Sequence, residues 1–270
     1  MCDIVSDLHI DQWDKDIGVK YPCGLVKHAP YTPNNSQNKI LIVAGDVSDS
    51  LHNTIKYLDT ISVYYEKILF VDGNHEHVNM YPNLYTHEEI NEKIKKLNNN
   101  KIVYLPCNPY QQGKTLFIGA CGWWDYNNAN LDAINSNLEY FKHWLPHLTR
   151  KENHEFIDNV IKRSREDYSK LEKLIELANQ DQTIENIIIV THCVPKRVFC
   201  CMKNIETILN TKFEELIKNK TLNRKLTHWI FGHIHHNIYQ TSGQIKFICH
   251  PRGRPEDYNR ELYDLFSSKL

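Results

Sequence analysis

The sequence predicts a layered α/β fold, and three observations support this. Short runs rich in β-branched and other apolar residues recur along the chain, as is typical of buried strands. Segments with the helical spacing of apolar residues lie between these runs, and strands that alternate with helices indicate an α/β architecture. The 270 residues are 41% hydrophobic and 24% charged, which is typical of a globular protein. We expect a single domain over residues 1–270, with insertions.

Eight apolar runs are expected to form the strands, because each is short and bounded by polar or turn-forming residues. They cover residues 4–5, 40–44, 68–71, 102–104, 116–118, 187–190, 228–231 and 245–248. The stronger runs are dominated by isoleucine and valine, which favour strands.

Helices are expected between and after these strands. The segment 50–65 has apolar residues at helical spacing, and Asp49 is a candidate N-cap for it. Further helices are predicted over about 154–179, over 205–218, and from Asp257 to the C-terminus. Two regions interrupt the alternation. We expect residues 11–38, with their Tyr, Pro and Asn, to form an irregular surface loop, and 123–180 to form a helical insertion or cap.

The charge of the chain argues against a broad electrostatic attraction to nucleic acid or to an anionic membrane. The formal net charge is −1, although a local basic patch remains compatible with it. No apolar run approaches 18 residues, and the start MCDIVSDLHI lacks the pattern of a signal peptide. We therefore expect a cytoplasmic protein whose eight cysteines are reduced. The absence of a CxxC pair argues against a structural zinc ribbon.

Polar residues with metal-binding chemistry follow five of the predicted strands. They are Asp7 and His9, Asp46 and Asp49, Asn74 and His75, His192, and His233 and His235. The carboxyl ends of strands are where open α/β sheets build their sites, so these groups are expected to meet at one edge. In extended backbone, residues i and i+2 point to the same side. Asp7 and His9 can therefore hold one object, and so can His233 and His235, while Ile234 faces away into packing.

The residue types indicate which ions would fit. Carboxylate, imidazole and one amide oxygen, without a thiolate at matching spacing, suit Mn, Fe or Zn and are too rich in nitrogen for calcium. There are enough ligands for two ions. A shared carboxylate would hold them roughly 3.5–4 Å apart, which is the geometry of two-metal hydrolysis.

The five blocks DxH, GDxxD, GNHE, a strand-terminal His and GHxH occur in this order from Asp7 to His235. Together they resemble the calcineurin-like metallophosphoesterase superfamily. The resemblance implies two mixed β-sheets flanked by helices, two divalent metal ions, and a phosphoester substrate. By the same resemblance, Asp7, His9 and His235 bind the first metal, Asn74, His192 and His233 bind the second, and Asp46 bridges the two.

The family also implies a mechanism, in which a metal-bound hydroxide attacks phosphorus in line with the leaving group. His75 would protonate the leaving oxygen or stabilise the transition state, and Asn74 would also contact the substrate. In the protein-phosphatase branch an Asp at the position of Asp49 orients this histidine; its alternative here is the N-cap role. The phosphate-binding Arg of that branch is replaced by Ser50, which disfavours a protein phosphatase.

Three further blocks are similar to a bacterial and phage subgroup of single-domain members. These are residues 121–125 (CGWWD), 191–195 (THCVP) and 250–253 (HPRG). Trp123, with Trp124 and Tyr126, can stack on a base or aromatic leaving group, or can form a packed cluster beneath the insertion. Arg252 and Arg254 can reach substrate phosphate or be surface charges. His236 either lines the rim of the site or has no role in it.

The predicted function is therefore a dinuclear metal-dependent phosphoesterase acting on a phosphomonoester or phosphodiester. A small, nucleotide-like substrate is favoured over nucleic acid, because the net charge gives no broad basic track. A phosphoprotein ranks third. The alternative is a non-catalytic binding or scaffold protein on the same fold. Members of that kind typically lose metal ligands or the catalytic His, and none is lost here. The sequence predicts no oligomeric state.

Overall fold

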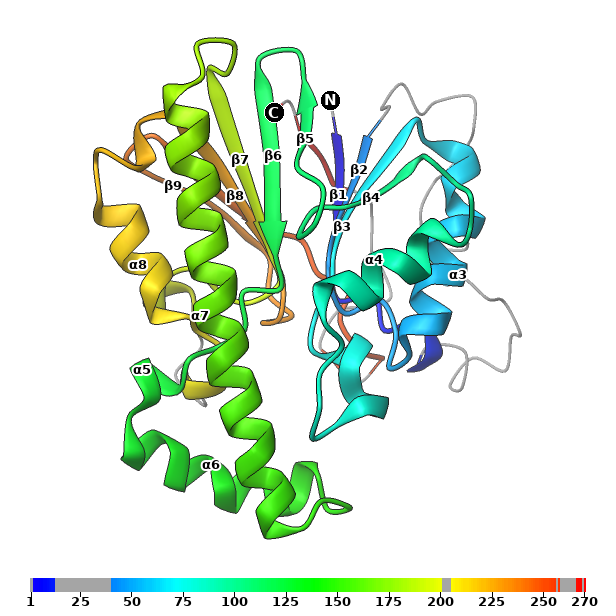
Figure 1. The fold of residues 1–270 in the computed structure, drawn as a ribbon, viewed down its shortest axis with the longest axis vertical. Coiled ribbons are helices and arrows are strands. Elements are labelled where there is room, and N and C mark those ends of the chain that lie inside the picture. Colours follow the sequence, from blue (N-terminus) through cyan, green and yellow to red (C-terminus); the bar gives the residue numbers. More distant parts are fainter. Residues whose placement is uncertain (1, 13–39, 201–204, 256, 258–265, 269) are drawn as a thin grey trace.

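Two β-sheets lie side by side, with helices covering their outer faces (Figure 1). This computed structural model describes residues 2–12, 40–200, 205–255, 257, 266–268 and 270. All eight predicted strands are present within them. The predicted architecture, a layered α/β fold with two mixed sheets, is confirmed.

The first sheet has five strands in the order β11-β1-β2-β3-β4. They are β1 (Cys2–Val5), β2 (Ile40–Ala44), β3 (Lys67–Val71), β4 (Ile102–Tyr104) and β11 (Phe266–Ser268). Neighbours from β1 to β4 are parallel, and β11 runs antiparallel to β1. The parallel arrangement brings the carboxyl ends of β1, β2 and β3 to one edge of this sheet.

The second sheet has six strands in the order β5-β6-β7-β8-β10-β9. They are β5 (Tyr110–Gln112), β6 (Thr115–Ala120), β7 (Asn186–Thr191), β8 (Leu226–Phe231), β9 (Ile238–Ser242) and β10 (Ile245–Cys249). The four central strands are parallel, and β5 and β9 are antiparallel edge strands. The carboxyl ends of β7 and β8 therefore share an edge as well.

Strand β2 shows how the apolar runs build two cores at once. Successive side chains of a strand point to opposite faces of the sheet. Leu41 and Val43 pack beneath the helices of the first sheet. Ile40, Ile42 and Ala44 face the second sheet and form the layer between the sheets. A strand that is buried on both faces needs a continuous apolar run, which is why the sequence identified it.

The helices cover the outside of each sheet (Figure 1). Helices α3 (Leu51–Ile61) and α4 (His87–Lys95) pack on the first sheet through a shared apolar core. Helices α7 (Arg150–Gln180) and α8 (Thr211–Lys218) pack on the second. Short 3-10 turns connect these elements: η1 (Ser62–Tyr64), η2 (His75–Met80), η3 (Arg197–Phe199), η4 (Ile205–Thr207) and η5 (Asn223–Lys225).

The segment 123–180, predicted to be mostly helical, contains α5 (Tyr126–Ala129), α6 (Leu131–Trp144) and α7. Helix α7 begins with a capping box formed by Thr149 and Glu152. Its second half contributes Leu171 and Ile175 to the core of the second sheet. Its first half packs with α6 and the Trp-rich segment after β6 in a separate apolar cluster. The segment is thus anchored to the sheet and extends beyond it, as Figure 1 shows.

Some elements were not predicted, and their composition explains why. Strands β5 and β9 are largely exposed and polar edge strands, so they lack an apolar run. Helix α4 is short and mainly polar, with only His87, Ile90 and Ile94 buried. The helix predicted over 205–218 is split into η4 and α8.

Two other predictions fall largely outside the described residues. The loop expected over residues 11–38 is one, since 13–39 are not described. The helix expected from Asp257 is the other, since 258–265 are not described either. The prediction that this helix continues to the C-terminus is wrong, because Phe266–Ser268 form the edge strand β11 against β1.

Within the described ranges, none of the helices combines the length and the apolar character that crossing a bilayer requires. The longest, α7, is strongly polar along its outer face.

The layer between the sheets should dominate the stability of the fold. Val190 is fully buried in this layer, whereas Val63 in η1 is 70% exposed. Val190→Ala removes two buried methyl groups and leaves a cavity, so we expect it to lower the free energy of unfolding by about 2 kcal/mol. Val63→Ala is the matched control and should change it little. Urea unfolding followed by circular dichroism measures both, and equal losses would contradict this account.

Candidate metal centre

The edge shared by the two sheets brings together all seven residues predicted to bind metal. Asp7 and His9 follow β1, Asp46 follows β2, and Asn74 follows β3. His192 follows β7, and His233 and His235 follow β8. The side chains come from both sheets and meet between their carboxyl ends.

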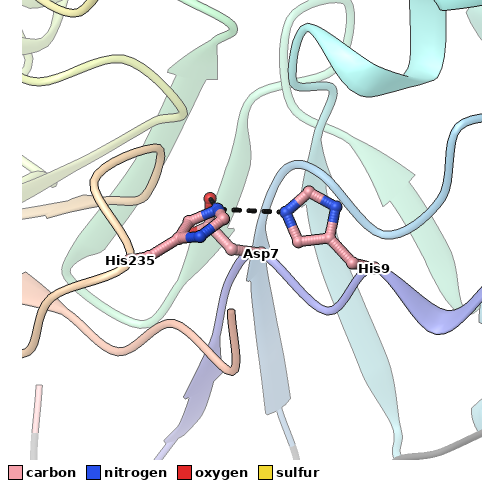
Figure 2. A group of neighbouring side chains, drawn as sticks. All are labelled: Asp7, His9 and His235. Carbon is pink, nitrogen blue, oxygen red and sulfur yellow. Dashed lines mark hydrogen bonds and ion pairs between the residues drawn. The ribbon is translucent and has the colours of Figure 1, made fainter. Parts of the chain in front are cut away.

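One group of ligand atoms consists of Asp7, His9 and His235, which Figure 2 shows pointing toward one another. Nε2 of His9 lies 3.0 Å from Nε2 of His235. The same His235 nitrogen lies 3.5 Å from Oδ1 of Asp7. Three donor atoms that converge at these distances can enclose a single small cation.

The second group consists of Asp46, His192 and His233, with Asn74 beside them. Nε2 of His192 lies 3.1 Å from Oδ2 of Asp46, 3.1 Å from Oδ1 of Asn74 and 3.0 Å from Nδ1 of His233. Asp46 also falls within 4.8 Å of the ligand atoms of His9 and His75. Its carboxylate therefore lies between the two groups, where a bridging ligand belongs.

Three of these histidines are oriented by hydrogen bonds from the ring nitrogen that faces away from the ligand group. Nδ1 of His192 donates to the carbonyl of Ala44 at 2.9 Å, and Nε2 of His233 donates to the carbonyl of Thr207 at 2.9 Å. Nδ1 of His235 pairs with Oδ2 of Asp257 at 2.6 Å. The other nitrogen of each ring then faces inward, where it can bind a metal once it carries no proton.

The electrostatics around the second group agree with this arrangement. Burial, together with the nearby His192, lowers the pKa of His233 to about 3, so this ring is neutral at physiological pH. Burial opposes the ionisation of Asp46, but His192 and His75 hold its pKa well below the ordinary value. Asp46 in turn raises the pKa of His192. A cation that binds His192 must displace this proton, so binding should strengthen as the pH rises.

The backbone at the ligands differs from the extended conformation that the sequence suggested. The φ angles are 49° at Asp7, 43° at His9, 73° at His233 and 49° at His235, and Asp46 has 55°. Such left-handed values are uncommon outside glycine and concentrate at functional sites. The prediction that His233 and His235 hold one object through i, i+2 spacing is wrong. They contribute to different groups, which agrees with the assignment implied by the family resemblance. Ile234 does pack against the core of the second sheet.

Two glycines permit the close approach of the loops. A Cβ atom on Gly73 would lie 2.2 Å from Oδ1 of Asp46. Gly45 has a φ of 79°, and a Cβ there would lie 2.7 Å from Nδ1 of His192. Any side chain at either position would displace a ligand.

Glu76, the last residue of the GNHE block, holds the loops after β2 and β3 together, and sequence reasoning missed this role. Its fully buried carboxylate accepts hydrogen bonds from four backbone N–H groups and one hydroxyl. The donors are the N–H groups of Asp46, Val47, Ser48 and Gly73 and the hydroxyl of Thr54, at 2.7–3.4 Å. Its place directly after His75 in the motif is the signal that could have revealed it.

Beside the ligand groups, His75 contacts Asp49. Nδ1 of His75 lies 2.5 Å from Oδ1 of Asp49. The alternative N-cap role for Asp49 is wrong, because Ser50 caps α3 by accepting from the N–H of Asn53. Burial lowers the pKa of His75, but Asp46 and Asp49 outweigh it and the net shift is upward. A histidine held this way retains its proton at higher pH than usual.

The aromatic residues after β6 form a packed cluster, and substrate stacking on Trp123 does not fit the structure. Trp123 is fully buried and contacts His77 and Trp124. Trp124, also buried, stacks on the ring of His233 with centroids 5.7 Å apart. The cluster thus supports a ligand histidine from behind. The sequence could not decide between the two roles of Trp123, because the CGWWD block does not indicate whether its indole is buried or accessible.

The two arginines after β10 have different surroundings. Arg252 is fully buried, so neither the surface-charge interpretation nor access to substrate fits it in this structure. Arg254 is half-buried, and its Nη2 lies 3.1 Å from Nε2 of His75. His236 is exposed, and its Nδ1 donates to the carbonyl of Ile234.

Comparison with known proteins agrees with this geometry. A family model described as calcineurin-like phosphoesterase matches residues 3–237. The chain belongs to the calcineurin-like phosphoesterase family. This confirms the resemblance drawn from the five motifs and makes the protein a metal-dependent phosphoric ester hydrolase. The Asp, His and Asn donors described above fit two divalent ions of this family.

Individual relatives extend the comparison. The uncharacterized protein L509 of Acanthamoeba polyphaga mimivirus is 26% identical over 247 residues, covering 86% of this phosphoesterase and 83% of the viral protein. The crystal structure of the phosphopantetheinyl hydrolase PptH from Mycobacterium tuberculosis superposes with a TM-score of 0.64 and 17% identity, covering 96% of this chain and 91% of that one. A dimetal phosphatase from Danio rerio superposes with a TM-score of 0.51 and 14% identity, covering 92% and 86%. These likenesses show that the fold is shared.

Glu76→Gln tests the role of the buried carboxylate. The amide keeps the size of the side chain but replaces an acceptor oxygen with an NH₂ group that faces backbone donors. We expect a loss of about 3 kcal/mol in the free energy of unfolding, together with weaker metal retention. Urea unfolding and metal analysis by mass spectrometry measure the two effects.

The matched control is Glu185→Gln, which removes an exposed ion pair with Lys114 and should leave both quantities almost unchanged. Equal behaviour of the two variants would contradict the role assigned to Glu76.

Proposed function

We propose that this phosphoesterase hydrolyses a small phosphomonoester at a dinuclear centre formed by the seven converging residues. The observation that carries the proposal is the position of Asp46 between two ligand groups, with His75 and Asp49 beside it. In this proposal Asp7, His9 and His235 hold one divalent ion, and Asn74, His192 and His233 hold the other. Bound there, the two ions would lower the pKa of a water molecule and neutralise charge on the phosphoryl group.

The chain's own residues supply the remaining chemistry. Water adds to phosphorus, the bond to the ester oxygen breaks, and the products are phosphate and an alcohol. His75 delivers a proton to the departing oxygen, while Asp49 orients its ring through Nδ1. The short contact between these two residues supports this role. The amide of Asn74, next to His75, is placed to contact the substrate as well.

The exposure of the side chains indicates from which side substrate would reach the site. Asp49 and His235 are the more accessible side chains, at 40% and 17% exposed, while Asp7 and His192 are completely buried. Substrate would therefore approach from the side of Asp49 and His235. A net charge of −1 gives no global field that would attract nucleic acid, which also favours a small substrate. Phosphodiesters should be assayed beside phosphomonoesters. A phosphopantetheinyl ester should be included among the test substrates, because PptH is a phosphopantetheinyl hydrolase.

Removal of the ligands should abolish activity. Asp46→Ala or His192→Ala should lower the hydrolysis of nitrophenyl phosphate to the level of the blank, and chelation of the native protein should do the same. Added Mn²⁺ should restore the chelated native protein but not the variants. Full activity in a sample shown by metal analysis to be free of divalent ions would refute the proposal.

His75→Asn should lower kcat by roughly 10²–10³-fold, because it removes the general acid. Asp49→Asn should lower it by roughly 10–100-fold, because the ring loses its orienting partner. Both variants should keep their full metal content, and metal analysis beside steady-state kinetics checks this. A non-catalytic scaffold would instead bind metal and turn over no member of a phosphoester panel.

A further inference from the structure

Arg254 lies in a segment that is bonded to residues at the metal centre. After β10 the chain runs beside the end of β1, where Ser6 and Pro251 form a parallel bridge. The N–H of Gly253 donates to the carbonyl of Asp7 at 2.8 Å. The N–H of Arg254 donates to Oδ2 of Asp257 at 2.7 Å. The residue before Arg254 is therefore bonded to Asp7, and Arg254 itself is linked to His235 through Asp257.

The guanidinium of Arg254 reaches across to His75. Its Nη2 lies 3.1 Å from Nε2 of His75. A guanidinium only donates hydrogen bonds, so in this contact Nε2 of His75 acts as the acceptor. Nδ1 of His75 already faces Asp49, which fixes the opposite side of the ring. The guanidinium of Arg254 and the ring of His75 thus lie side by side, where both could contact one substrate.

The Arg254 guanidinium also has unused hydrogen-bonding capacity. Its Nε is buried and has no hydrogen-bond acceptor among the residues that the structure describes. A buried donor without an acceptor is costly, and a guanidinium matches the geometry of phosphate oxygens. Arg252, the arginine within the HPRG block, is enclosed completely and is a poorer candidate to meet a ligand.

We propose that the Arg254 guanidinium binds a non-bridging phosphoryl oxygen of the substrate beside His75 and favours dianionic phosphomonoesters over diesters. This inference rests on the proposed function of the same site. A phosphoryl oxygen beside Nη2 of Arg254 would accept its hydrogen bond in place of Nε2 of His75. A monoester dianion carries one more negative charge than a diester, so an added cation stabilises it more.

Phosphate binding provides a test that does not depend on turnover. Isothermal titration of inorganic phosphate into the metal-loaded protein should give a Kd about 10–100-fold weaker for Arg254→Gln than for the native chain, as expected for a lost charge-assisted hydrogen bond. Arg254→Lys keeps the charge without the planar fork and should fall between them. Arg150→Gln, an exposed position at the start of α7, is the matched control and should bind phosphate as the native chain does.

The preference for monoesters is measured with nitrophenyl phosphate and bis-nitrophenyl phosphate. In Arg254→Gln, kcat/KM should fall by roughly 10²-fold for the monoester and by clearly less for the diester. Metal analysis and circular dichroism should show that every variant is folded and loaded. Native phosphate affinity in a loaded Arg254→Gln protein, or equal losses on the two esters, would overturn the inference.

The outcomes also separate this inference from the proposed function. A native chain that hydrolyses no phosphoester, but whose phosphate binding weakens in Arg254→Gln, would overturn the function and leave the role of Arg254 in anion binding intact. A native chain that hydrolyses monoesters, with Arg254→Gln unchanged, would overturn the role of Arg254 alone.

Discussion

The site depends on one buried carboxylate. Glu76 joins the loop after β2 to the loop after β3, because its two oxygens accept the N–H groups of Asp46 and Gly73 together with their neighbours. Through these bonds it fixes Asp46 and the segment that carries Asn74 and His75. Burial and the nearby Asp46 raise the pKa of Glu76 to about 7, so its carboxylate needs hydrogen-bond donors around it, and the polypeptide backbone supplies most of them. The positions of Asp46 and of the segment with Asn74 and His75 thus depend on a residue that lies outside both candidate ligand groups.

Both sheets contribute residues to the candidate metal centre. The first contributes Asp7, His9, Asp46 and Asn74, and the second contributes the histidines after β7 and β8. The apolar layer between the sheets sets their separation, and the parallel strands within each one bring the loops to the same edge. Left-handed backbone at five of the candidate ligands costs conformational energy, which the rigid surrounding structure can support.

The sequence was most informative where chemistry and burial coincide. The strand β2 was predicted to its exact ends because both of its faces are buried and apolar. The candidate metal-binding residues could be identified because each follows such a strand. Edge strands such as β9 escaped, since exposure on an antiparallel edge leaves no apolar pattern. Long-range partners escaped for a different reason: nothing in the local sequence indicates that Asp257 meets His235, or that Trp124 lies behind His233.

The carboxylate of Asp257 contacts both His235 and Arg254, and this has a thermodynamic consequence. One of its oxygens accepts from the ring of His235 and from the backbone of Arg254. A cation that binds His235 would, through Asp257, also stabilise the position of the loop that carries the Arg254 guanidinium. An anion that binds the guanidinium would stabilise the position of the His235 ring in the same way. Cation and oxyanion would then promote each other's binding by the same factor, as linkage requires. The site would then bind a cation and an anion cooperatively, with Asp257 coupling the cation at His235 to the anion at Arg254.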